Sequence, residues 1–201
     1  MLNVLITGIG GQGTVLAAKL MAQAARSRGW KVRTAETIGM AQRGGSVVSH
    51  VRMGDAGEDV AAPLLNNATA DLIVAFEPAE AARCLPYLAC DGTVVCAQSA
   101  IQPVTAALAG GSYSAPEVLD GLRRAFDGGQ AKLVIVDDAA LAAASGTRKA
   151  LNVMLLACAL QSAQLPITVD DLRDAVRVCV KERFVDMNLA AIDAALKVLG
   201  E

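Results

Sequence analysis

Short apolar runs alternate with amphipathic segments along most of the chain. Continuous runs such as "NVLIT" and "DLIVAF" are typical of strands buried on both faces of a parallel sheet. The third predicted strand, "SVVSHVRM", alternates apolar and polar residues instead, which indicates two different faces. The predicted strands cover residues 3–7, 31–36, 46–53, 71–76, 92–97 and 132–138.

Helical periodicity of 3.6 residues separates most of these runs. The predicted helices cover residues 14–28, a segment opening at Glu77-Pro78, a segment opening with the Ser114/Glu117 capping pair, residues 148–163, a segment from the Thr168/Asp171 pair to about Lys181, and residues 186–199. Strands that alternate with helices predict an α/β fold with a mainly parallel, covered sheet and a helical C-terminal part.

The length of 201 residues, without repeat or linker, predicts one domain spanning 1–201. Apolar residues make up 54% and aromatic residues 3%, so the core must be built from small aliphatic side chains. The net charge of −2 gives no electrostatic attraction to nucleic acid or to an anionic membrane. With no signal segment and no membrane-spanning run, we expect a cytoplasmic protein.

The cysteines are odd in number and none are spaced C-x-x-C, which argues against a zinc or iron–sulfur site in this chain. We expect them to be small buried hydrophobic residues in a reducing compartment. They are Cys84, Cys90, Cys96, Cys158 and Cys179.

The stretch "LITGIGGQGTVLAAKL" carries the first candidate site. Its glycines fit the G-x-G-x-x-G pattern between a strand and a helix, where backbone amides can bind a phosphate. They are Gly8, Gly10 and Gly13, and Gly11 beside them belongs to the same candidate site. A ligand-binding loop and a purely structural tight turn both remain open. A dinucleotide-binding protein also needs an acidic residue for the ribose, and Glu36 could serve.

The second candidate site is "ETIGMAQRGGSVVSHVRMG". Gln42, Arg43, Gly44 and Gly45 combine a guanidinium fork with an exposed glycine backbone. That set suits a phosphate, a carboxylate or a partner's backbone. An ordinary surface loop with a solvated arginine is the alternative.

Other polar residues have both a chemical and a structural interpretation. His50, the only histidine, could be a general acid or base, or a buried structural residue. Asp137 and Asp138 follow a strand and could face a ligand or cap a helix. Glu77 and Glu80 are expected to favour the dipole of the helix they open.

Together, "GIGGQGTVLAAKLMAQAA" and "QRGGSVVSHVR" resemble the gamma-type domain of the 2-oxoacid:ferredoxin oxidoreductases. The resemblance continues through "DLIVAFEPAEAARCLPYLACDGTVV", "RKALNVMLLACAL" and "DMNLAAIDAAL". It implies a three-layer Rossmann-like sandwich and a subunit of an enzyme that oxidatively decarboxylates an arylpyruvate such as indolepyruvate. Coenzyme A would take the acyl group and ferredoxin the electrons.

The resemblance places thiamine diphosphate, Mg²⁺ and [4Fe–4S] clusters in a larger partner subunit. The residues agree, because the only Asn-Asn pair, Asn66-Asn67, is not preceded by the G-D-G of a thiamine site. We therefore assign no cofactor and no catalytic or metal-binding residue to this chain. A free-standing NAD(P)- or flavin-dependent oxidoreductase and a ligand-free interaction subunit remain as alternatives.

Overall fold

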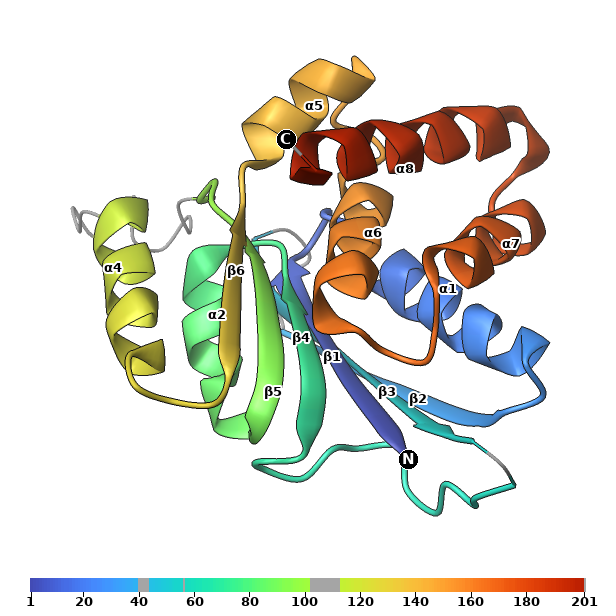
Figure 1. Ribbon diagram of the computed structural model, residues 1–201, viewed down its shortest axis with the longest axis horizontal. Helices are drawn as coiled ribbons and strands as arrows, with labels where there is room; N and C mark the ends of the chain where they lie inside the picture. Colours follow the sequence, from blue (N-terminus) through green and yellow to red (C-terminus); the bar gives the residue numbers. More distant parts are fainter. Residues whose placement is uncertain (40–43, 56, 102–112, 201) are drawn as a thin grey trace.

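The computed structural model describes residues 1–39, 44–55, 57–101 and 113–200. Its centre is a six-stranded sheet in the order β2-β3-β1-β4-β5-β6 (Figure 1). All six predicted strands are confirmed, with somewhat different bounds. They are β1 (Leu2–Ile9), β2 (Lys31–Ile38), β3 (Ser46–Gly54), β4 (Ala70–Ala75), β5 (Leu88–Ala97) and β6 (Lys132–Val136).

The sheet is mainly parallel, as predicted, with one reversed strand. β1, β4, β5 and β6 pair in parallel, whereas β3 runs antiparallel to both β1 and β2. The strict alternation of strand and helix fails here, because β2 and β3 follow each other as antiparallel neighbours in the sheet. As a result, the start of β3 lies beside the C-terminal end of β1, where Ile9 faces Ser46.

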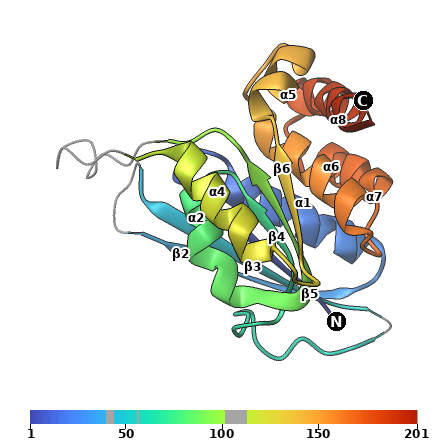
Figure 2. The ribbon, with the colours of Figure 1, turned by 60° about the vertical axis from the view of Figure 1, so that its left-hand side comes forward.

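Helices cover both faces of the sheet and make the three layers (Figures 1 and 2). One face carries α2 (Pro78–Cys84) and α4 (Ala115–Phe126). On the other side lie α1 (Thr14–Ser27), α6 (Leu151–Ala163), α7 (Val169–Cys179) and α8 (Val185–Gly200). The helix α5 (Asp138–Ser145) sits beyond the end of β6 and packs against α8. Short 3₁₀ turns, Leu85–Tyr87 and Glu182–Phe184, complete the chain.

Local sequence signals explain several boundaries. Thr168 and Asp171 form a complete capping box at the start of α7. The predicted helix from residue 148 begins instead at Leu151, and its residues from Asn152 to Leu160 are all buried. β6 ends at Val136, because Asp137 already caps α5 with its carboxylate.

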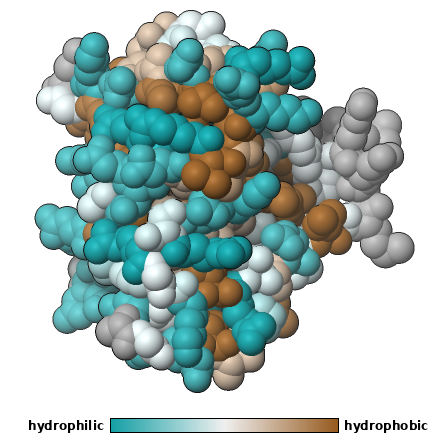
Figure 3. All heavy atoms as spheres, turned by 90° about the vertical axis from the view of Figure 1, so that its right-hand side faces the viewer, coloured by the Kyte–Doolittle hydropathy of each residue, from teal (hydrophilic) through white to brown (hydrophobic). Residues whose placement is uncertain are grey.

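The outer surface of the C-terminal helices is largely polar. Figure 3 shows this side covered by hydrophilic residues with small apolar patches between them. The exposed apolar side chains of the chain include Val178 and Phe184 at the end of α7 and just beyond it. Among the residues that the structure describes, no helix combines the length and apolarity needed to cross a membrane.

Candidate functional site

The first glycine segment forms a turn that its own side chains fill. The Gln12 side chain accepts a hydrogen bond from the Ile9 amide at 2.6 Å and donates one to the Phe76 carbonyl at 2.9 Å. A Cβ on Gly8 would lie 2.7 Å from Gln12 Oε1 and 3.1 Å from Phe76 Cβ. Gly8 is therefore needed because Gln12 closes the gap between the ends of β1 and β4.

Gly13 is required for two further reasons. It caps α1 in the left-handed region, at φ +86°, which favours glycine. A Cβ there would lie 2.7 Å from Asn152 Nδ2. Asn152, at the start of α6, also donates a hydrogen bond to the Gly13 carbonyl at 3.3 Å. The third glycine of the motif thus sets how α6 packs on the loop. The pattern itself assigns this glycine to the close packing of the strand and the helix that follows.

The two glycine segments lie side by side. The Gly10 amide donates a 2.9 Å hydrogen bond to the Gly45 carbonyl, an arrangement made possible by the reversed direction of β3. Gly44 has a left-handed φ of +77°. Gln42 and Arg43, predicted as contacts of the same site, lie outside the described residues.

Glu77 and Glu80 are buried, which the sequence did not predict. Glu77 caps α2 and accepts hydrogen bonds from the Glu80 amide and the Tyr113 hydroxyl. Glu80 accepts a 2.5 Å hydrogen bond from Ser46 Oγ, directly after the second glycine segment. Burial and the Glu77 carboxylate raise the pKa of Tyr113, so its hydroxyl stays protonated and donates. These acids hold Ser46 and Tyr113 against α2.

Asp137 and Asp138 have different roles. Asp137 caps α5, with its carboxylate accepting from the Ala140 amide at 2.9 Å. Asp138 is fully buried and accepts a 2.8 Å hydrogen bond from the Ser99 amide. Its second oxygen pairs with Arg148 at 2.8 Å. The helix-capping interpretation is right for Asp137, and Asp138 instead positions an arginine.

A crevice of about 240 Å³ opens beside the first glycine segment, at the C-terminal edge of the parallel strands. We call it the basic crevice, because Arg148 and Lys149 line it together with the glycine loop. The glycine loop and its neighbours form more of the lining, with Gly11, Gln12, Phe76 and Asn152. Sequence reasoning missed Arg148 and Lys149. Their only signal is a basic pair directly before the apolar run that forms α6.

Glu36 does not take the position of a ribose-binding acid. It lies on the exposed edge strand β2, and β3 separates this strand from β1. With strands spaced about 4.8 Å apart, the backbone of Glu36 is roughly 10 Å from that of β1. In the dinucleotide-binding fold the acidic strand is the direct neighbour of the glycine strand. This geometry weighs against the NAD(P) alternative.

His50 is a buried structural residue. It is 4% exposed, its Nδ1 accepts a 3.2 Å hydrogen bond from the Leu65 amide, and its ring meets Tyr87 edge to face. Burial lowers the pKa of His50 below its ordinary value, so the neutral ring is favoured.

We expect the stability contributed by neutral His50 to be present above about pH 6.5 and to be lost as the pH falls through the lowered pKa. Below about pH 6.5 the unfolded chain takes up a proton that the folded state resists. The measurement is urea unfolding from pH 7.5 to 5, compared with His50→Asn, which retains an acceptor but does not titrate there. A variant with the same pH dependence as the parent chain would contradict this assignment.

The cysteines divide into two groups. Cys84, Cys96 and Cys158 are buried, as predicted. Burial raises the pKa of Cys96 to about 12 and that of Cys158 to about 11, so both remain protonated. The prediction is wrong for Cys90, which is exposed near the start of β5, and Cys179 is half-buried. In the part of the chain that the structure describes, no three His, Cys, Asp or Glu residues lie close enough to hold a metal ion.

Comparisons with known proteins cover nearly the whole chain. A family model described as pyruvate ferredoxin/flavodoxin oxidoreductase matches residues 3–198. The indolepyruvate oxidoreductase subunit IorB of Pyrococcus horikoshii is 36% identical over 200 residues, covering 99% of this chain and 96% of that protein.

Two solved structures share the fold at 18% identity. The gamma subunit of a keto/oxoacid ferredoxin oxidoreductase from Geobacter sulfurreducens has a TM-score of 0.67, covering 98% of this chain and 97% of its own. A 2-oxoglutarate:ferredoxin oxidoreductase from Magnetococcus marinus, solved with 2-oxoglutarate, coenzyme A and succinyl-CoA, has a TM-score of 0.69. This chain spans 30% of it.

Proposed function

Because the chain belongs to the pyruvate ferredoxin/flavodoxin oxidoreductase family, we propose that it is the accessory subunit of a 2-oxoacid:ferredoxin oxidoreductase. The resemblance to the gamma-type domain, predicted from the motifs, is thereby confirmed. The observation that carries the proposal is the full-length similarity to an indolepyruvate oxidoreductase subunit. Indolepyruvate or another arylpyruvate is accordingly the proposed substrate of the complex.

In this proposal a larger partner subunit binds thiamine diphosphate, Mg²⁺ and the [4Fe–4S] clusters. Bound there, they would supply the chemistry of decarboxylation and of electron transfer to ferredoxin, and coenzyme A would take the acyl group. The described residues of this chain include no cluster of His, Cys, Asp or Glu that could hold a metal ion, so we assign the Mg²⁺ and the [4Fe–4S] clusters to the partner. The proposed contribution of this chain is to bind the partner subunit and to position a ligand group. We place the complex in the cytoplasm.

The proposed contact region is the edge where the two glycine segments meet. Gly8 and Gly13 shape the turn, Gly10 ties it to Gly45, and Gly11 and Gly44 have left-handed backbone conformations. Gln42 and Arg43 belong to this proposed region by sequence. There the arginine fork would hold a carboxylate or a phosphate of coenzyme A in two hydrogen bonds.

The proposal is tested by reconstitution. We expect the isolated chain to show no arylpyruvate oxidation with thiamine diphosphate, coenzyme A and an electron acceptor. Addition of the thiamine-containing larger subunit should restore it. The measurement is reduction of a viologen dye. Turnover by this chain alone would refute the accessory role, and so would full turnover by the larger subunit alone.

An Arg43→Lys variant in the same assay examines the contact region. It keeps the charge and loses the fork, so turnover or coenzyme A affinity should fall about tenfold or more while the subunits still assemble. Unchanged kinetics in both Arg43→Lys and Arg43→Ala would remove Arg43 from the site. Arg124→Lys is the control, because Arg124 lies exposed on α4 and this variant should leave turnover and coenzyme A affinity unchanged.

A further inference from the structure

We infer that the basic crevice binds a phosphate group, through Arg148, Lys149 and the backbone at Gly11. The inference goes beyond the proposed subunit role and does not depend on it. It shares Gly11 with the proposed contact region, but it is centred on the turn before α6, which meets the glycine loop at Gly13, and not on the second glycine segment, which meets the loop at Gly10.

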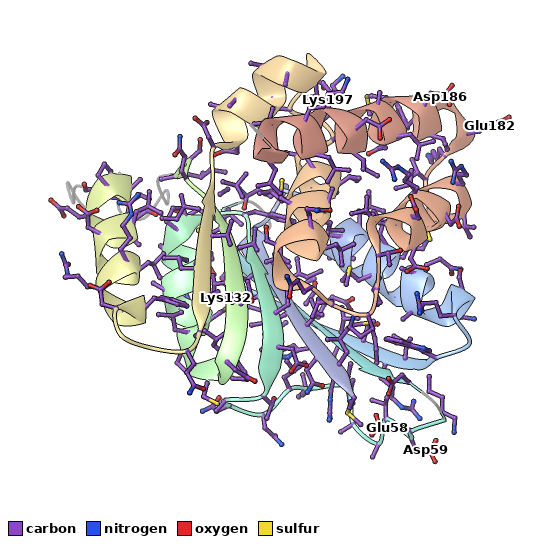
Figure 4. The ribbon with its side chains drawn as sticks, viewed as in Figure 1. Glu58, Asp59, Lys132, Glu182, Asp186 and Lys197 are labelled. Carbon is purple, nitrogen blue, oxygen red and sulfur yellow. The ribbon has the colours of Figure 1, made fainter. Side chains whose placement is uncertain are left out.

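The charges of the crevice favour an anion. Arg148 uses one nitrogen for Asp138, and a guanidinium has five N–H donors, so others remain for a ligand. Lys149 makes no ion pair within the described residues. The nearest acids, Glu77 and Asp138, have their carboxylates engaged by hydrogen bonds within the fold. Glu58 and Asp59 lie near the start of β1, far from the crevice (Figure 4).

The backbone of the glycine loop, which also lines the crevice, adds a candidate donor. Gly11 lines the crevice, has a φ of +104°, and has no heavy atom within 4 Å of the position of a Cβ, so the space beside its Cα is open. In the described part of the chain the Gly11 amide has no hydrogen-bond acceptor. A phosphate between Gly11 and the two cations would combine a backbone donor with charge-assisted hydrogen bonds.

The Arg148 side chain and the backbone of the turn that carries both cations are held in place without a ligand. Asp138 is fully buried and fixed by the Ser99 amide, and it pairs with Arg148. The turn that carries both cations is closed by hydrogen bonds from Ser145 Oγ to the Thr147 carbonyl at 3.0 Å and from the Lys149 amide to Thr147 Oγ1 at 3.1 Å. Such preorganisation lowers the entropic cost of binding.

The size of the crevice limits what it can enclose. Its volume of about 240 Å³ is below the roughly 300 Å³ at which pockets begin to enclose drug-sized molecules. A phosphate or diphosphate fits, whereas a whole dinucleotide does not. The rest of a larger ligand would have to extend out of the crevice.

The test is calorimetric titration of the full chain with inorganic pyrophosphate at low salt. We expect saturable binding that weakens about tenfold or more in both Lys149→Ala and Arg148→Ala. Lys149→Ala is the decisive variant, because the side chain of Lys149 takes part in no hydrogen bond within the described residues, so folding should not change. Arg124→Ala, an exposed arginine on α4, is the matched control and should bind as the parent chain does.

Competition separates the possible sources of the phosphate. Displacement of pyrophosphate by ADP or by coenzyme A would support a site for a phosphate carried on a larger ligand. Binding of pyrophosphate without such competition would support a site for free phosphate. Absence of pyrophosphate binding to the parent chain would overturn the inference, as would equal weakening in Arg124→Ala. Neither result would affect the reconstitution assay, so the two proposals fail separately.

Discussion

Gly13→Ala is expected to lower the free energy of unfolding by about 2–5 kcal/mol. The left-handed φ of +86° at this position costs an L-residue about 1–2 kcal/mol. A Cβ placed 2.7 Å from Asn152 Nδ2 must in addition displace the start of α6, and such overpacking costs about 1–3 kcal/mol. The measurement is the urea unfolding midpoint at constant m-value.

Gly128→Ala is the matched control, because Gly128 has a φ of +73° and no heavy atom within 4 Å of its Cβ position. It carries the backbone strain alone and should cost about 1–2 kcal/mol. Equal losses in the two variants would contradict the proposed clash. Adding Asn152→Ala to Gly13→Ala should restore only the part of the free energy of unfolding that the clash with Asn152 removes.

The fold was largely predictable because its elements are encoded locally. Apolar runs gave β1, β4, β5 and β6, alternation gave β3, and capping residues such as Thr168 marked helix starts. The direction of β3 was not predictable from the same pattern. Alternating residues on "SVVSHVRM" are compatible with either direction, and strand pairing depends on contacts between distant segments.

The candidate site was predictable only in part. The motif correctly marked a tight strand-to-helix turn, because the backbone requirements of Gly8 and Gly13 are local. The side chain of Gln12 in that turn, and the cations of the basic crevice, could not be deduced. Arg148 and Lys149 reach the glycine loop only because β6 and α5 return the chain to the same edge of the sheet.

Asp137 and Asp138 show the same limit at a smaller scale. A pair of aspartates after a strand predicts a helix cap or a ligand contact, but not which residue has which role. The backbone at the start of α5 decides it, since Asp137 turns toward the Ala140 amide and Asp138 toward Ser99 and Arg148.

Asp138→Ala is expected to lower the free energy of unfolding by about 1–4 kcal/mol. Most of this loss comes from the Ser99 amide, which is left without its acceptor at about 1–3 kcal/mol. The ion pair adds little, because the Arg148 side chain is 59% exposed and a pair screened by water contributes about 0–1 kcal/mol. Urea unfolding of the full chain measures the loss.

Two comparisons assign that loss to its cause. Asp138→Asn keeps an oxygen for the Ser99 amide, so it should cost less than half as much as Asp138→Ala. A double-mutant cycle of Asp138→Ala with Arg148→Ala should give a coupling energy of at most about 1 kcal/mol, since the pair is exposed on one side. A larger coupling energy, with Asp138→Asn as costly as Asp138→Ala, would show that the charge of Asp138 stabilises the fold through Arg148. In that case the position of Arg148 in the basic crevice would be a requirement of folding, and Lys149→Ala alone would have to decide whether the crevice binds phosphate.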